Sequence, residues 1–206
     1  MTLYEGYEFK GGILLQDAFF SPEILDPEEG GDPSLVNWLI HGFVVTAAEP
    51  MDEKVNGAVR NFLFGDPGLG GTDLATLNIQ RGRDHGVPGC NAVRQAFGLE
   101  PFNNLGDLTT NAAVQDKLKT VYNETNPFSD DGGGDMDLWL CGLVEDTVQD
   151  SGSHLGPTFN EIIKKQFRNL RNGDEFYYEN DPMISDPAVK DIIDLEAITL
   201  ADVIEF

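Results

Sequence analysis

Residues 76–89, with the sequence TLNIQRGRDHGVPG, concentrate cationic and hydrogen-bonding side chains in a chain that is otherwise strongly acidic. If a helix begins near Thr72, residues three or four positions apart share one face, and this face carries Leu74, Leu77, Asn78, Arg81 and His85. A guanidinium can form two parallel hydrogen bonds to a carboxylate. An Asn amide oxygen can accept a hydrogen bond from an imidazole N–H. Such a face is suited to an apolar ligand that carries carboxylates.

The same segment also allows a purely structural interpretation. Arg81 or Arg83 could pair with Asp84 and neighbouring carboxylates inside a core, and no ligand site would then exist. The residue types and spacing leave both alternatives open.

Helix signals lie on both sides of this segment. Thr72 is a candidate N-cap, and Asp73 would then lie at the positive end of the helix dipole. After the Pro88–Gly89 turn, CNAVRQAFGL predicts a short helix that stops at Gly98. Apolar residues at helical spacing predict further helices over residues 51–64, 111–122 and 158–170, with two short ones in 186–195 and 199–206. The segment 137–146 is apolar enough to be buried.

The first fifty residues begin with turns and continue with a helix. Paired Gly and X-Pro steps punctuate residues 1–33. Asp32 is a candidate N-cap for a helix whose first residue is Pro33. Because we find no internal repeat and no alternating strand pattern, the sequence predicts a mainly α fold.

Composition excludes several classes of partner. The 206 residues carry a formal net charge of −23, which argues against binding to nucleic acid or to an anionic membrane. No apolar run approaches the ~20 residues that a membrane-spanning helix needs. The opening MTLYEGYEFKGG lacks the basic start and apolar core of a signal peptide.

Two cysteines, Cys90 and Cys141, lie 51 positions apart and form no C-x-x-C motif. Metal binding through thiolates is therefore not expected. One disulfide or two buried thiols are both compatible with the sequence, and neither alternative fixes the redox compartment.

The run LNIQRGRDHGVPGCNAVR closely resembles the signature helix of the animal-type haem peroxidase family, in the peroxidase–cyclooxygenase superfamily. The family pattern reads leucine, asparagine, apolar, glutamine, arginine, any residue, arginine, aspartate, histidine, glycine, apolar, proline, glycine, aromatic, asparagine. The resemblance continues in DMDLWLCGLVED and in LGPTFNEIIKKQFRNLRNGDEFYYEN, and more loosely in LQDAFFSPEIL, so that it spans nearly all of residues 14–206. It implies that the chain is part of the multi-helical animal haem peroxidase fold.

The resemblance implies cofactor-binding roles for four residues. Asn78 matches the asparagine that hydrogen-bonds the proximal histidine ligand of the haem iron and so fixes the orientation of the imidazole. Arg81 matches the arginine that pairs with a haem propionate. Leu74 and Leu77 would be apolar neighbours of the proximal haem face.

In the family, the remaining haem residues lie upstream of the matched segments. They are the catalytic distal histidine and arginine, the proximal histidine and the calcium-binding loop. We therefore expect residues 1–206 to be the C-terminal portion of a single catalytic domain, incomplete at both ends, with no catalytic residue and no metal ligand of its own. The implied cofactor is haem, either b-type or covalently linked. Ca²⁺ belongs to the full-length family, and its ligands are not expected in this chain.

Other chemically active residues receive structural interpretations. Arg83, Asp84 and His85 are assigned structural roles within the signature, His41 is expected to cap or pack a helix, and His154 is expected to be exposed on a turn. Cys90 stands where the family usually has an aromatic residue, which predicts looser packing there.

Two charged clusters are likewise not interpreted as sites. Asp130, Asp131, Asp135 and Asp137 surround a Gly run but lack the spacing of an EF-hand loop, so a solvated insertion is favoured over a Ca²⁺ site. Lys164, Lys165, Arg168 and Arg171 lie at helical spacing near a predicted helix end, where cations complement the dipole.

The implied function is reduction of H₂O₂ coupled to oxidation of a small organic or halide donor, with this chain supplying the proximal-side haem support. The expected partners are H₂O₂, the donor and the remainder of the peroxidase domain, and the isolated chain is expected to be inactive. The resemblance favours an extracellular protein, whereas the chain itself leaves the compartment unknown.

Two alternatives remain at this stage. One is a fatty-acid dioxygenase of the same superfamily, which would need a tyrosyl radical. Tyr177 and Tyr178 are available, although the resemblance does not place a radical on either of them. The other is a non-catalytic, peroxidase-like interaction module.

Overall fold

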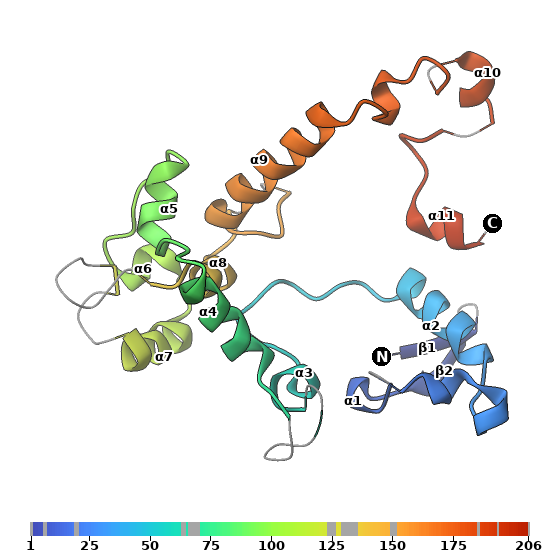
Figure 1. Cartoon of the computed structure of the whole chain (residues 1–206), viewed down its shortest axis with the longest axis horizontal. Coiled ribbons are helices and arrows are strands. Elements are labelled where there is room, and N and C mark those ends of the chain that lie inside the picture. Colours follow the sequence, from blue (N-terminus) through green and yellow to red (C-terminus); the bar gives the residue numbers. More distant parts are fainter. Residues whose placement is uncertain are drawn as a thin grey trace. The chain divides into compact units, whose positions relative to one another are not determined.

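The computed structural model describes residues 2–5, 8–18, 21–62, 65, 71–122, 127–128, 136–148, 152–184, 186–192 and 194–205. These residues are mostly helical, which confirms the mainly α fold class. The chain divides into two compact units, residues 1–49 with 174–206, and residues 50–173. We call them the terminal unit and the central unit, and Figure 1 labels their elements.

The terminal unit combines a hairpin with short helices. Its elements are β1 (Thr2–Glu5), β2 (Glu8–Gly12), α1 (Leu15–Ala18), the 3₁₀ turns η1 (Pro22–Leu25) and η2 (Pro27–Glu29), α2 (Ser34–Val45), η3 (Tyr178–Asn180), α10 (Pro187–Lys190) and α11 (Leu200–Glu205). Helix α2 packs closely on β1 because Gly42 has no side chain: a Cβ there would overlap the carbonyl oxygen of Thr2.

The β1–β2 hairpin lies in the turn-rich segment 1–33, where the sequence showed no alternating strand pattern. The two strands pair antiparallel with a bulge between Leu3 and Tyr4, and Leu3 is buried. Strands of four and five residues give little alternation to detect, and packing against α2 supplies stability that an isolated hairpin lacks. The start of α2 is as expected within one residue, and the Asp32 carboxylate accepts hydrogen bonds from the Ser34 N–H and hydroxyl.

The central unit is helical. Its elements are α3 (Gly57–Asn61), α4 (Leu74–Asp84), α5 (Cys90–Ala96), α6 (Leu105–Leu108), α7 (Ala112–Tyr122), α8 (Leu138–Val144) and α9 (Pro157–Gly173). The expected helices at 90–98, 111–122 and 158–170 are confirmed. Gly98 follows α5 in the left-handed conformation, with a φ of 75°.

Two helix starts differ from the sequence prediction. Asp73, rather than Thr72, is the N-cap of α4, and its carboxylate accepts hydrogen bonds from the N–H groups of Ala75 and Thr76. The helix expected over 51–64 is confined to α3. Asn56 caps it by accepting from the Ala58 N–H, so the capping side chain competes successfully with helix continuation upstream. Residues 63–64 of that prediction lie outside the described part of the chain.

A buried core and a disulfide hold the central unit together. Leu108, Met136, Cys90 and Cys141 are almost wholly excluded from solvent. Cys90 and Cys141 form a disulfide between α5 and α8, with their Cα atoms 6.1 Å apart. The expectation of looser packing at position 90 is therefore wrong, because Cys90 is fully buried in the core and covalently bonded to Cys141.

No helix among the described residues is long and apolar enough to cross a membrane.

Candidate functional site

The central unit contains a cavity of about 800 Å³, which is within the usual size range of cofactor and ligand pockets. Side chains from α4, α7, α8 and α9 contribute to its wall, including Asn78, Arg81, Tyr122, Asp137, Trp139 and Phe159. The full lining combines aliphatic and aromatic side chains with four polar ones, Asn78, Arg81, Arg83 and Asp137. This is the composition expected of a site for a large, partly polar ligand.

Helix α4 presents Asn78 and Arg81 to this cavity. Asp73 fixes the start of the helix, and the two residues are three positions apart, so they lie on one face. Among the described residues, neither the Asn78 amide nor the Arg81 guanidinium has a hydrogen-bond or ion-pair partner. Both polar groups therefore remain available to a ligand.

The two other residues that the resemblance singled out lie differently. Leu74 is half-buried and Leu77 is 46% exposed, and neither is among the residues that line the cavity. Their assignment to the haem face therefore stays a prediction.

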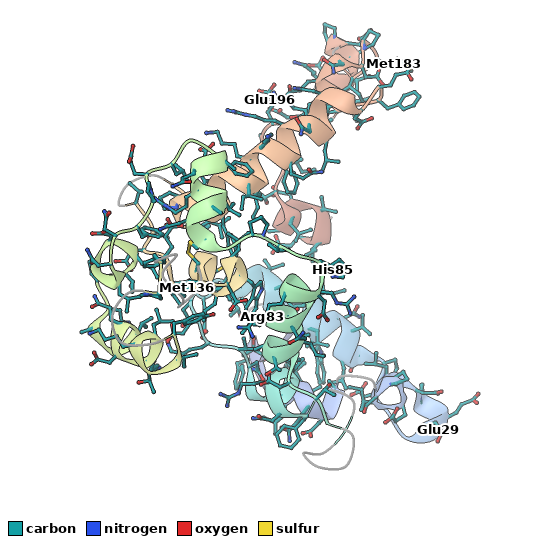
Figure 2. The ribbon with its side chains drawn as sticks, turned by 60° about the vertical axis from the view of Figure 1, so that its left-hand side comes forward. Glu29, Arg83, His85, Met136, Met183 and Glu196 are labelled. Atoms are coloured by element: carbon teal, nitrogen blue, oxygen red, sulfur yellow. A yellow bond between two sulfur atoms is a disulfide. The ribbon has the colours of Figure 1, made fainter. Side chains whose placement is uncertain are left out.

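The structural alternative for the signature placed Arg81 or Arg83 beside Asp84 inside a core, and the structure differs from it: Arg83 forms an ion pair with another carboxylate, and its side chain is 58% exposed. The Arg83 guanidinium donates two hydrogen bonds to Asp137 at the start of α8, from Nε to Oδ1 at 2.9 Å and from Nη2 to Oδ2 at 2.7 Å. Asp84 instead accepts a hydrogen bond from Gln80 on the same helix. Figure 2 labels Arg83, together with Met136, which directly precedes Asp137.

Tyr122, at the end of α7, joins this ion pair. Its hydroxyl donates to Asp137 Oδ2 at 2.5 Å. The hydrogen bonds from Arg83 lower the pKa of Asp137 despite its partial burial. Burial, together with the adjacent carboxylate, raises the pKa of the Tyr122 phenol. The cluster therefore consists of an ionised carboxylate between a cation and a neutral phenol.

Sequence reasoning assigned no role to Tyr122 and grouped Asp137 with a solvated insertion. The available signal was positional: Asp137 immediately precedes the buried segment LWLCGLV, where a charge needs a partner. Asp130, Asp131 and Asp135 of the same prediction lie outside the described residues.

A second arginine, Arg94 on α5, is buried. Its guanidinium pairs with Glu145 and donates to the Thr158 hydroxyl at 2.7 Å, while its Nε donates to the Glu100 carbonyl. It also lies over the Phe102 ring, 3.8 Å from the centroid. This network ties α5 to the end of α8 and to the start of α9.

Glu145 completes the network from the acidic side. Its carboxylate accepts from the Thr158 N–H at 2.7 Å and from the Thr158 hydroxyl at 3.0 Å. Burial raises the pKa of Glu145, and the bonds from Thr158 and Arg94 oppose that rise. Because α8 carries Trp139 and α9 carries Phe159, the network also supports two aromatic rings of the cavity wall.

None of the three histidines is among the residues that line the cavity. His41 is half-buried within α2, His154 is exposed, and the exposed His85 caps α4 with Nδ1 3.0 Å from the Arg81 carbonyl oxygen. Among the described residues, no group of three or more His, Cys, Asp or Glu side chains is arranged to hold a metal ion.

Comparison with known proteins accounts for the signature helix. The family model for animal haem peroxidases matches residues 2–205, nearly the whole chain. The chain belongs to the animal haem peroxidase family.

Curated relatives agree with this assignment. The chain is 39% identical over 182 residues to peroxinectin A of Dictyostelium discoideum, and the match covers 86% of this chain and 31% of that protein. It is 36% identical over 181 residues to peroxidasin of Drosophila melanogaster, where the match covers 85% of this chain and 11% of that protein. The chain therefore spans about a third or less of the length of these relatives.

Solved structures show the same architecture. Peroxidase A from Dictyostelium discoideum superposes with a TM-score of 0.73 at 34% identity, over 93% of this chain and 33% of that one. A fatty acid alpha-dioxygenase from Oryza sativa superposes with a TM-score of 0.60 at 19% identity, over 79% of this chain and 26% of that one. At that identity the second likeness concerns the fold alone.

Proposed function

We propose that this chain forms the proximal-side haem support of a haem-dependent peroxidase. The observation that carries the proposal is that Asn78 and Arg81 line one cavity and have no partner among the described residues. Family membership supplies the cofactor class, and the cavity supplies the chemistry that haem needs: aromatic walls for the macrocycle, a cation for a propionate and an amide for an imidazole N–H.

The residues of this chain would bind and orient rather than react. Arg81 would hold a propionate through charge-assisted hydrogen bonds, and Asn78 would accept from the proximal imidazole and fix its tautomer. Arg83 would not compete for the propionate because its guanidinium is already paired with Asp137. When bound, haem supplies the redox chemistry, which is reduction of H₂O₂ and oxidation of a small organic or halide donor.

The proximal imidazole and the distal catalytic groups would come from outside this chain. The three histidines here lie away from the cavity lining, and the chain spans about a third of the length of peroxinectin A. We therefore propose that residues 1–206 belong to one catalytic domain whose remainder is the principal partner of this chain. The buried disulfide favours an oxidising compartment, in keeping with an extracellular peroxidase.

A titration with ferric protoporphyrin IX, with imidazole added as the missing ligand, tests this proposal. Binding is followed by the Soret band. Because Arg81 contributes a charge-assisted contact, Arg81→Gln is expected to weaken binding about tenfold, or ~1.4 kcal/mol. Asn78→Ala is expected to reduce the enhancement of binding that imidazole produces in the unaltered chain.

Two controls make the test specific. The dimethyl ester of the same porphyrin has no free carboxylate, so the unaltered chain and Arg81→Gln should bind it equally. Lys164→Gln removes one positive charge from α9, away from the cavity lining, and should leave binding unchanged. The proposal fails if the unaltered chain does not bind the porphyrin, or if Arg81→Gln weakens binding of acid and ester alike.

A further inference from the structure

The Tyr122–Asp137–Arg83 cluster has no part in the proposed binding of haem, yet it forms part of the same cavity wall. Three helices contribute to it: Tyr122 ends α7, Asp137 precedes α8 and Arg83 lies near the end of α4. The phenol and the guanidinium share one carboxylate, with both Tyr122 Oη and Arg83 Nη2 on Asp137 Oδ2.

Ordinary acid–base chemistry does not use this phenol. Burial and the adjacent carboxylate raise the pKa of Tyr122, so the hydroxyl keeps its proton at any physiological pH. The carboxylate, whose pKa is lowered by Arg83, stays ionised and ready to accept a proton. The geometry thus pairs a permanent phenol donor with a permanent carboxylate acceptor.

A phenol in this arrangement can still lose its proton if it loses an electron at the same time. Removal of one electron makes the O–H group strongly acidic, and the 2.5 Å hydrogen bond provides an acceptor with no need for water. The Arg83 guanidinium donates to both carboxylate oxygens of Asp137 and so holds the acceptor in place.

We propose that Tyr122 is an oxidisable side chain on the cavity wall. It gives one electron to a metal-complex oxidant in the adjoining cavity, and its proton passes to Asp137 Oδ2. The O–H bond of Tyr122 breaks and an O–H bond forms on Asp137, leaving a neutral tyrosyl radical and a neutral carboxylic acid. A small phenolic donor then supplies one electron and releases its own proton to solvent, becoming a phenoxyl radical. The proton on Asp137 returns to Tyr122 and restores its O–H bond.

Two other tyrosines provide an internal contrast. Tyr177 and Tyr178 stack on each other, with ring centroids 5.0 Å apart. The Tyr178 hydroxyl lies 3.5 Å from an exposed Glu179 carboxylate oxygen, at the limit of hydrogen bonding. The acceptor next to Tyr178 is thus exposed and distant, whereas the acceptor of Tyr122 is partly buried and 2.5 Å away.

Flash photolysis of this chain with a photogenerated ruthenium(III) polypyridyl complex tests the proposal without haem. Its outcome is therefore independent of whether the cavity binds haem. Tyrosyl radical formation is followed by transient absorbance and by electron paramagnetic resonance. We expect one fast phase whose rate does not change with buffer concentration and slows in D₂O, because its proton acceptor is internal.

Variants show which tyrosine is oxidised in the fast phase. Tyr122→Phe should abolish it and Tyr178→Phe should leave it intact. Asp137→Asn removes the acceptor and should slow the phase about a hundredfold, the low end of the usual range for a positioned general base, and make it depend on buffer. Asp137→Glu restores a carboxylate and should restore the independence from buffer.

Circular dichroism and thermal unfolding establish that each variant is folded. The isotope and buffer measurements on the unaltered chain need no variant at all. The proposal is overturned if every radical phase of the unaltered chain depends on buffer, or if a folded Tyr122→Phe variant retains the fast phase.

Discussion

Two arginine–carboxylate pairs in the central unit use the same chemistry in opposite environments. The Arg94 and Glu145 side chains are only 9% and 3% exposed, whereas those of Arg83 and Asp137 are 58% and 16% exposed. The first pair joins three helices through Thr158 and is screened from water. The second lies at a cavity wall, where water or a ligand can replace a lost partner.

This difference gives the two pairs different roles: the buried pair stabilises the fold, and the exposed pair is accessible from the cavity. A buried charge whose partner is removed cannot be solvated, so the whole network depends on each of its members. An exposed pair contributes little to folding and is free to take part in chemistry at the cavity. The comparison therefore predicts that substitution of Arg94 lowers the free energy of unfolding strongly, whereas substitution of Arg83 changes it little.

The strongest challenge to the comparison is Arg94→Ala. Since it leaves the buried Glu145 carboxylate without its cation, we expect the free energy of unfolding to fall by about 3–5 kcal/mol. Urea denaturation followed by far-ultraviolet circular dichroism measures the change. A loss below ~1 kcal/mol would mean that water reaches Glu145 and that the two pairs are alike.

The disulfide provides the next largest effect, in the same buried region. Replacing both Cys90 and Cys141 by Ala should lower the free energy of unfolding by about 2–4 kcal/mol, since the link constrains the unfolded chain over 51 residues. The same denaturation experiment measures it. Reducing agent should leave the unfolding curve of the double variant unchanged, and a shift of that curve would refute the assignment of the effect to the disulfide.

At the exposed Arg83–Asp137 pair, we expect a change of pH to affect the free energy of unfolding more than removal of the arginine side chain does. Arg83→Ala is expected to cost about 0–1 kcal/mol at neutral pH. Because the pKa of Asp137 is lowered in the folded chain, its stabilising contribution is complete above the ordinary value of 3.8 and is lost as pH falls through the lower folded pKa.

For Glu145 the sign is reversed. Burial raises its pKa above 4.5, so between that value and the folded pKa the folded chain holds a proton that the unfolded chain has released, and stability falls as pH rises through this window. Thermal unfolding measured over a pH range that covers both windows tests this. Asp137→Asn should lose the rise in stability with pH at the acidic end, and Glu145→Gln should lose the fall in stability above pH 4.5. If the two variants showed the same dependence of stability on pH, the opposite pKa shifts of Asp137 and Glu145 would be refuted.

The smallest effect is expected at a third ion pair, on the exposed part of α9. Lys164 and Glu161 lie three residues apart, and their Nζ and Oε1 atoms are 2.8 Å apart. Lys164→Ala should change the free energy of unfolding by no more than about 0.5 kcal/mol. Thermal unfolding at low and high salt measures it, and a larger, salt-sensitive loss would show that exposure alone does not rank these pairs.

Local signals in the sequence were sufficient for the longer helices of the central unit and for the shared face of Asn78 and Arg81. Asn78 and Arg81 lie three positions apart on one helix, so periodicity alone puts them on one face, and the structure places both at the cavity. The start of α7 likewise follows from Asn111, whose side chain accepts from the N–H groups of Ala113 and Val114.

What the sequence could not give depends on tertiary contacts. Arg83 reaches Asp137 across 54 positions, and Arg94 reaches Glu145 across 51, so no periodicity links either pair. The sequence could not distinguish a disulfide from two thiols for the same reason, because the answer depends on whether α5 and α8 lie in contact. The β1–β2 hairpin escaped prediction since its stability comes from α2 rather than from its own residues.

The Cys90–Cys141 bond also changes the covalent connectivity of the chain. It closes a ring of backbone that contains α5, α6 and α7. A single cleavage of the backbone inside that ring leaves both parts in one molecule, and they separate only on reduction. Such a ring would allow a chain cut within it to keep its cavity wall assembled.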